Sequence, residues 1–197
     1  FSSPDSYIGD YKDGKMDGTL IVWNNRDNKK KKIIEGDYKN GKRFGSHISW
    51  HRNGNKQEES DWEDDIQHGK WLRWFENGQK KQEGVFKEGL QDSDWTFWHE
   101  NGEIMEKSTW RDGKLHGKQV QFEKNGNILV KRNFKDGKIY GKWTLYNYHD
   151  NGKISKEINF ISAKKSKGIE ELDDSVPLDE WQEAVQGSIP DGKSYGY

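Results

Sequence analysis

Aromatic residues recur along the chain at a nearly constant interval and define a repeated unit. A first aromatic row has members 24 to 27 residues apart: Tyr11, Tyr38, Trp62, Phe86, Trp110, Phe134 and Phe160. A second aromatic row follows twelve residues later in each unit, at Trp23, Trp50, Trp74, Trp98, Phe122 and Tyr146. Self-similarity at a fixed period of this length is the signature of stacked repeats. The pattern therefore predicts six units, which start near the first-row aromatics from Tyr11 to Phe134.

Within each unit, apolar and polar residues alternate as they do in β-strands. Residues 71–75 and 95–98 show this period of two, and glycine interrupts it twice per unit, once in a pair such as Asn101-Gly102 and once at a position such as Gly89. Two strands of about seven residues joined by a tight turn make a β-hairpin. The sequence predicts an all-β fold, an elongated single antiparallel meander of about a dozen strands over residues 1–160.

The turn type decides which residues share a face of the sheet. A two-residue Asn-Gly turn would place the two aromatic rows on opposite faces, whereas a three-residue loop with a left-handed glycine would place them together. We expect the three-residue loop. One aromatic face would then also carry Leu72, Ile104 and the small residues Gly84 and Ser108.

The opposite face would present a second set of large side chains. Trp and Arg dominate interaction hot spots, so we predict a partner-binding patch there: Trp71, Arg73, Trp95, Phe97 and Trp143. The alternative is that this face packs against a C-terminal cap or against the stems of neighbouring lysine and glutamate side chains.

Composition supports a thin aromatic core and a surface of balanced charge. Only 29% of residues are hydrophobic, but ten Trp, eight Tyr and eight Phe supply large rings, each of which buries on the order of 150 to 250 Å². With 33 basic and 34 acidic residues the net charge is -1. No global field steers the chain toward nucleic acid, and no such partner is expected.

The sequence contains no recognisable catalytic or metal-binding pattern. Cysteine is absent, which excludes thiol catalysis and cysteine-ligated zinc. His51 and His99 occupy equivalent positions two units apart, about 19 Å at the spacing of β-strands, which is too far to share a metal. Neither a serine nucleophile elbow nor a phosphate-binding glycine loop appears. We therefore expect no enzymatic activity, no cofactor and no metal.

Two segments fall outside the hairpin pattern. The first unit contains a basic run, which is either an exposed hairpin tip or a contact to anionic lipid or nucleic acid: Lys29, Lys30, Lys31 and Lys32. Beyond residue 160 we expect a charged linker (161–174), a short helix (175–187) and an extended tail (188–197). One stripe of that helix would cap the last hairpin or dock on a partner, and its members are Leu178, Trp181 and Val185.

The start of the chain also departs from the pattern. Residues 7–11 match the second half of a unit, so the array is expected to begin with a half-hairpin. The first residue is Phe1 and not Met. This start suggests a processed extracytoplasmic or organellar protein, membrane-associated through a partner, or a cytoplasmic one whose start has been trimmed.

The order of the glycine and aromatic signals resembles the MORN (membrane occupation and recognition nexus) repeat. In one unit the pattern reads Trp110, Gly113, Gly117, Phe122 and Asn125-Gly126. It is most similar to the bacterial variant found in YwqK-type antitoxins and covers residues 7–160. The resemblance implies a hairpin-repeat scaffold, and members are associated with protein partners, lipid headgroups or toxin neutralisation. Asp65 and Ser93 stand where the pattern has glycine.

These observations favour a binding function. We expect a non-enzymatic scaffold that contacts another protein, as an accessory subunit of a larger complex or as a toxin-neutralising partner. The alternative is a membrane-periphery module that contacts phospholipid headgroups, or a glycan-binding module.

Overall fold

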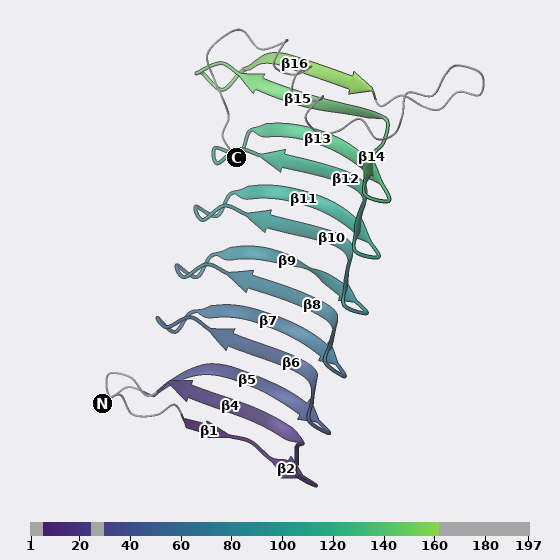
Figure 1. The fold of residues 1–197 in the computed structure, drawn as a ribbon. Coiled ribbons are helices and arrows are strands. Elements are labelled where there is room, and N and C mark those ends of the chain that lie inside the picture. The colour runs from purple at the N-terminus through teal and green to yellow at the C-terminus, as the bar shows by residue number, and fades with distance from the viewer. Residues whose placement is uncertain (1–5, 25–29, 162–197) are drawn as a thin grey trace, which may run out of the picture. The chain divides into compact units, whose positions relative to one another are not determined.

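The structure, a computed structural model, describes residues 6–24 and 30–161, and every helix or strand assigned in these ranges is a β-strand (Figure 1). The predicted helix with Leu178, Trp181 and Val185 lies outside the described residues, as do Lys29, the tail and nearly all of the linker. The strands are β1 (Ser6–Ile8), β2 (Tyr11–Lys12), β3 (Lys15–Met16), β4 (Gly18–Asn24), β5 (Lys31–Lys39), β6 (Lys42–Trp50), β7 (Lys56–Glu63), β8 (Ile66–Trp74), β9 (Lys80–Lys87), β10 (Leu90–Trp98), β11 (Ile104–Arg111), β12 (Lys114–Phe122), β13 (Ile128–Lys135), β14 (Lys138–Ile139), β15 (Lys142–Tyr148) and β16 (Ile154–Ile161).

The strands pair in chain order, as a meander. The main sheet has fourteen strands, in the order β1, β4 to β13, β15 and β16, with β14 beside β13, while β2 and β3 form a separate pair. All of these pairings are antiparallel, and β1 lies against β4 with Tyr7 opposite Val22. The predicted single antiparallel meander is confirmed, and it begins with a half-hairpin.

Loops containing Asn-Gly lie along one edge of the sheet, the left edge in Figure 1. In the loop after β6, the His51 N–H donates to the Asn55 carbonyl at 2.8 Å and the Gly54 N–H donates to the His51 carbonyl at 2.9 Å. Gly54 has a φ of 99°. This is the three-residue loop with a left-handed glycine, as predicted. The same pair of bonds recurs after Phe75, His99, Glu123 and His149.

Two-residue turns line the other edge and join one hairpin to the next. Asp112 and Gly113 have φ values of 48° and 74°, and two positive φ values identify a type I′ turn. The Gly113 N–H donates to the Gln91 carbonyl at 2.9 Å, and Gly89 donates in the same way to Gln67. Each turn is thereby bonded to the preceding hairpin.

A β-bulge beside every Asn-Gly loop overturns the predicted assignment of faces. Trp74 lies opposite Lys80, but Arg73 lies opposite Gln82, so Lys81 is an extra residue in β9. An extra residue reverses the alternation of side chains. The same shift occurs in the hairpins β4–β5, β6–β7, β10–β11, β12–β13 and β15–β16. The two aromatic rows therefore lie on opposite faces, and the prediction that they share one was wrong.

We name the two sides of the sheet after residues of β10. The Trp95 face carries the first aromatic row from Tyr38 to Phe134, the small residues Gly84 and Ser108, and the predicted patch. The Trp98 face carries the second aromatic row with Leu72 and Ile104. In the last hairpin Tyr148, and not Tyr146, takes the second-row place opposite Ile154, because that unit is longer by two residues.

The core lies mainly on the Trp95 face. Trp95 and Val130 are each 1% exposed, and the buried polar residues of this face are His47, Ser60, Ser108 and Gln119. Side chains of neighbouring hairpins cover one another along this face. Large rings thus allow one sheet to bury a core of its own.

Candidate interaction surfaces

The first four residues of the predicted patch contact one another on the Trp95 face. The ring of Trp95 lies 5.3 Å from that of Trp71 and 6.0 Å from that of Phe97. The Arg73 guanidinium lies 5.7 Å from the Trp71 ring, and its Nε lies 3.5 Å from a Glu58 carboxylate oxygen.

First-row rings complete this cluster. Phe86 meets Trp71 and Trp95 edge-on, with centroids 5.7 and 5.1 Å away. Trp143 lies on the same face but in β15, separated from Trp95 by β11, β12 and β13. Because Trp95 is 1% exposed, the centre of the predicted patch is core, and only its margin offers area to a partner. Binding by this patch stays a prediction.

Small residues of the return strands make room for these rings. A Cβ at Gly84 would overlap the Trp95 indole, and one at Gly36 would overlap the His47 imidazole. Where serine replaces glycine, a first-row tryptophan follows two residues later. Its indole Nε1–H donates to the serine hydroxyl, at 2.9 Å from Trp62 to Ser60 and at 3.0 Å from Trp110 to Ser108.

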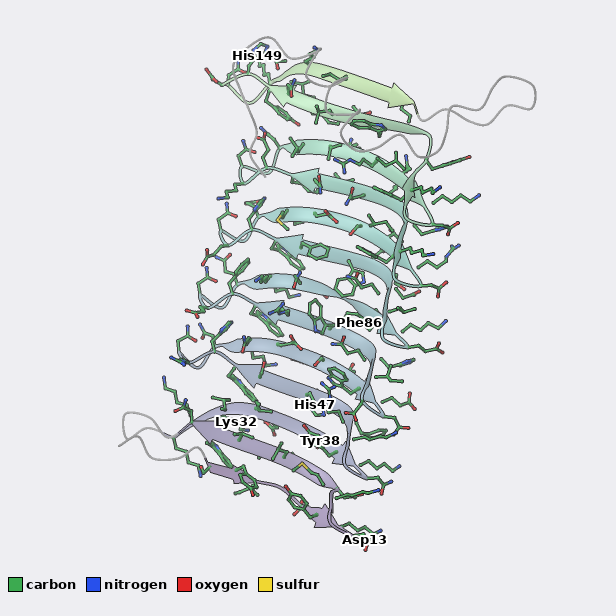
Figure 2. The ribbon with its side chains drawn as sticks, in the orientation of Figure 1. Asp13, Lys32, Tyr38, His47, Phe86 and His149 are labelled. Carbon is green, nitrogen blue, oxygen red and sulfur yellow. The ribbon has the colours of Figure 1, made fainter. Side chains whose placement is uncertain are left out.

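His47 takes the place in the second unit that Trp95 has in the fourth. Its ring is 9% exposed and lies 5.1 Å from Tyr38 and 6.2 Å from Trp62, centroid to centroid; Figure 2 shows Tyr38 and His47 on neighbouring strands. Nε2 donates to the Asp37 carbonyl at 2.7 Å. Burial lowers the pKa of His47, although this hydrogen bond opposes the shift. Its burial and its contacts make His47 part of the core of the Trp95 face.

The Trp98 face carries a ladder of alternating aromatic rings and lysines. The Lys56 Nζ lies 5.5 Å from the centroid of the Trp74 ring, and the Lys80 Nζ lies 5.6 Å from that of Trp98. Each lysine is also opposite the tryptophan of its own hairpin, Lys56 opposite Trp50 and Lys80 opposite Trp74. Each ammonium group therefore lies over a ring of the next hairpin in cation–π geometry.

Glutamates hold these lysines in place. Ion pairs join Lys32 to Glu35 at 2.7 Å, Lys56 to Glu59 at 2.6 Å and Lys80 to Glu83 at 2.6 Å. All six side chains are substantially exposed, so each pair contributes at most about 1 kcal/mol to stability. The second-row rings beside them are half-buried. The ladder is an ordered surface and not a core.

The sequence analysis identified the second aromatic row but placed it in the core. It did not identify the lysines that lie beside these rings. A signal was present, because a lysine with a glutamate three residues later recurs at Lys32, Lys56 and Lys80. Charged residues at a fixed place in successive units indicate a solvated face. In the folded hairpins these lysines lie opposite the second-row tryptophans.

The described lysines of the basic run are engaged within the protein. The Lys30 Nζ lies 4.0 Å from the centroid of the Trp23 ring, and the Lys31 Nζ donates to the Arg52 carbonyl at 3.1 Å. Lys32 is paired with Glu35; Figure 2 shows it near the Asn-Gly loop edge. These contacts reduce the charge that the run offers to a lipid surface.

Asparagine and histidine link neighbouring loops along the same edge. The Asn77 and Asn101 amides donate to the carbonyls of Glu100 and Lys124, at 3.0 and 2.8 Å. The His51 Nε2 donates to the Trp74 carbonyl at 3.0 Å, and His99 does the same to Phe122 at 3.1 Å. These histidines tie one repeat to the next.

The described residues hold no other feature that suggests chemistry. No group of three or more potential metal ligands occurs within residues 6–24 and 30–161. A shallow depression of about 280 Å³ beside the loops is lined by polar side chains that include His51, Arg73 and Lys81. In the same ranges, no helix has the length and apolar character needed to cross a membrane.

Comparison with known families identifies the repeat. A family described as a MORN repeat variant matches residues 67–88, 91–112, 115–136 and 141–162. Each matched segment corresponds to one long hairpin, β8–β9, β10–β11, β12–β13 and β15–β16. No curated protein matches the chain. Residues 67–162 thus match four tandem copies of the MORN repeat variant, within an array of β-hairpins that the described residues form.

Proposed function

We propose that this scaffold binds another protein and that the Trp98 face is its contact surface. The observation that carries the proposal is the row of half-buried rings, one per hairpin, on the open side of a single sheet. Their spacing is about 10 Å at two strands per hairpin. Rings already held in position lose little conformational entropy on binding, so their remaining apolar area favours association.

Protein is a better fit than sugar for this surface. A glycan would stack on the faces of the rings, but the ammonium groups of Lys56 and Lys80 already lie close to the rings of Trp74 and Trp98. Large aromatic residues such as tryptophan are enriched in protein interfaces. Toxin neutralisation, as in YwqK-type antitoxins, is one form that such binding could take.

A lipid headgroup is the second candidate, and the contacts of the basic run count against it. Lys30, Lys31 and Lys32 each have a partner within the protein. An electrostatic contact to an anionic membrane relies on several lysines that remain available, each contributing about 1 kcal/mol. We therefore favour the protein partner and assign no catalytic step to the chain.

Site-specific photocrosslinking tests the proposal. The photoreactive amino acid p-benzoylphenylalanine replaces Trp74 or Trp98, one at a time, and the protein is irradiated in native lysate. Tyr140, 49% exposed and beside the turn edge, serves as the matched control, and Phe97 reports on the predicted patch of the Trp95 face. We expect the same adduct from Trp74 and Trp98 and none from Tyr140.

The four positions separate the competing surfaces. An adduct formed equally from Tyr140 would mean nonspecific contact. An adduct from Phe97 alone would move the contact to the Trp95 face and overturn the proposal. The identity of the captured protein then follows from mass spectrometry.

A further inference from the structure

The Trp98 face changes its charge pattern between β9 and β11. In the first three long hairpins, the residue opposite the second-row tryptophan is Lys32, Lys56 or Lys80. In the last three, the equivalent residue is Ile104, Ile128 or Ile154. The residue three places later changes as well, from Glu83 in β9 to Lys107 in β11 and Lys131 in β13, and is a glutamate again, Glu157, in β16.

This exchange gathers lysines on the Trp98 face, where Asp94 of the adjoining strand β10 accepts a hydrogen bond from the Thr109 hydroxyl at 2.8 Å. Lys107 and Lys131 flank Val120 across β11, β12 and β13, and Lys118 and Lys142 lie on the same face in β12 and β15. All four lysine side chains are exposed, and the Lys131 Nζ also lies 5.3 Å from the centroid of the Tyr146 ring. Within the described residues, no ion pair involves any of them, and the paired positions of this face on these four strands include no Asp or Glu.

The lysines form a compact group. β11, β12, β13 and β15 are consecutive in the sheet, and strands lie about 4.8 Å apart, so one lysine comes from each strand within about 15 Å. Like charges at this spacing repel one another. A partner that brings negative charge relieves this repulsion and gains attraction at each lysine.

An apolar row runs beside the basic group, toward the loops. It consists of the second-row rings and the isoleucines opposite them, Trp98, Ile104, Phe122, Ile128, Tyr148 and Ile154. Ile154 is 53% exposed, and the others are half-buried. In the first half of the sheet the equivalent row is interrupted by Lys56 and Lys80.

We propose that this half of the Trp98 face, β10 to β16, binds an acidic protein segment that also carries apolar side chains. The proposal rests on the protein-binding function proposed above and names the chemistry of the partner. Carboxylates of the segment meet Lys107, Lys118, Lys131 and Lys142, while its apolar side chains cover the isoleucine and aromatic row. Isoleucine offers no stacking surface to a nucleobase, which favours a protein over a nucleic acid.

Fluorescence anisotropy with a defined probe tests this proposal. The probe is a short fluorescein-labelled peptide of alternating glutamate and leucine, and a peptide with glutamine in place of glutamate is its match. We expect the acidic peptide to bind at least about tenfold more tightly than its match at low salt, and to weaken steeply toward about 0.5 M NaCl, where the Debye length is only a few ångströms.

Charge reversal locates the site. The double variant Lys107→Glu/Lys131→Glu is expected to lose at least about tenfold in affinity for the acidic peptide. Lys114→Glu/Lys138→Glu makes the same charge change on exposed residues at the turn edge, in β12 and β14, and should stay within about threefold. Unchanged affinity in the first variant, or an equal loss in both, overturns the proposal, as does a failure of the peptide to bind.

Two further probes separate the classes of partner. Tighter binding of single-stranded oligothymidine, or of phosphatidylserine vesicles, than of the acidic peptide would overturn the protein assignment. The photocrosslinking at Trp74 and Trp98 gives an independent answer on the proposed function. An adduct there with no effect of Lys107→Glu/Lys131→Glu refutes only the acidic chemistry, whereas absence of any adduct refutes protein binding itself.

Discussion

The indole of Trp95 occupies the space in which any side chain at Gly84 would begin. Gly84 is absent from the residues with positive φ, so packing and not backbone conformation requires glycine there. Gly36 has the same relationship to the His47 ring. Trp95 and His47 thus each rest directly on the backbone of the preceding hairpin, which explains how Trp95 becomes almost fully buried.

Replacing Gly84 with alanine should destabilise the fold. Overpacking of a well-filled core costs about 1 to 3 kcal/mol, and urea unfolding followed by tryptophan fluorescence would measure the change in the free energy of unfolding. Trp95→Phe in the Gly84→Ala background should recover part of the loss, because the smaller ring can shift. A Gly84→Ala variant as stable as the parent would contradict the described packing.

Ser60 and Trp62 should be energetically coupled through their hydrogen bond. Ser60→Ala leaves the Trp62 Nε1–H without its acceptor, at a cost of about 1 kcal/mol. In a Trp62→Phe background the same substitution should cost close to nothing. Thermal or urea unfolding of the four proteins gives a double-mutant cycle, and additive effects would show that the bond contributes no stability.

Gly69 and Ser93 occupy equivalent positions in the third and fourth units. Gly69→Ser and Ser93→Gly should change the free energy of unfolding in opposite directions. Gly69 has a φ of 111°, and a Cβ there would lie 2.9 Å from an Asp61 carboxylate oxygen, whereas Ser93 is a non-glycine residue with a φ of 60°. Gly69→Ser should lower the free energy of unfolding by about 1 to 3 kcal/mol. Ser93→Gly should raise it by up to about 1 kcal/mol, because left-handed backbone is strained for serine.

The melting temperatures of Gly69→Ser and Ser93→Gly, each compared with the parent, test this prediction. A lower melting temperature for Ser93→Gly would mean that the hydrogen bond from its hydroxyl to the Asp92 carboxylate outweighs the backbone strain. Melting temperatures that change by the same amount and in the same direction would contradict the argument from backbone conformation.

His47 should make the fold less stable as the pH falls. Burial holds its folded-state pKa below the usual 6.5, so the unfolded chain binds a proton more readily. The stability that depends on neutral His47 is complete above about pH 6.5 and declines below it, until the folded-state pKa is reached. The nearby charges of Arg43, Asp37 and Asp65 modify the shift, Arg43 lowering the pKa and the two carboxylates raising it.

His47→Gln is the suitable comparison, because Gln119 occupies the equivalent place in the fifth unit. The free energy of unfolding should be measured for both proteins between about pH 5 and 8. As the pH falls, the free energy of unfolding of the parent should decrease relative to that of His47→Gln. A difference that stays constant over this range would show that His47 does not titrate differently in the folded state.

The repeat and its loops could be predicted because their signals are local. The aromatic period gives the number of units, and Gly54 and its equivalents specify a three-residue loop. The bulge could not be predicted in the same way. Its extra residue is Gln57, Lys81, Met105 or Leu129 in successive hairpins, so no residue type marks it, yet it decides which face every later side chain occupies.

The candidate surface was affected by the same shift. The predicted patch was correct in bringing Trp71, Arg73, Trp95 and Phe97 together, but Phe86 joined them and Trp95 became core. Small residues offered a partial signal, because Gly84 and Ser108 lie where a neighbouring large ring needs space. Pairing across strands had to be known before that signal could be read.

The bonds between successive turns make the ribbon modular in length. The Gly89, Gly113 and Gly137 N–H groups each reach back by one hairpin, to Gln67, Gln91 and Leu115. Excising or duplicating one complete unit would therefore leave every donor facing an equivalent acceptor, while a cut of any other size would mismatch them. Such arrays can grow or shrink by whole units during evolution, with their binding surface lengthened or shortened in steps of one ring.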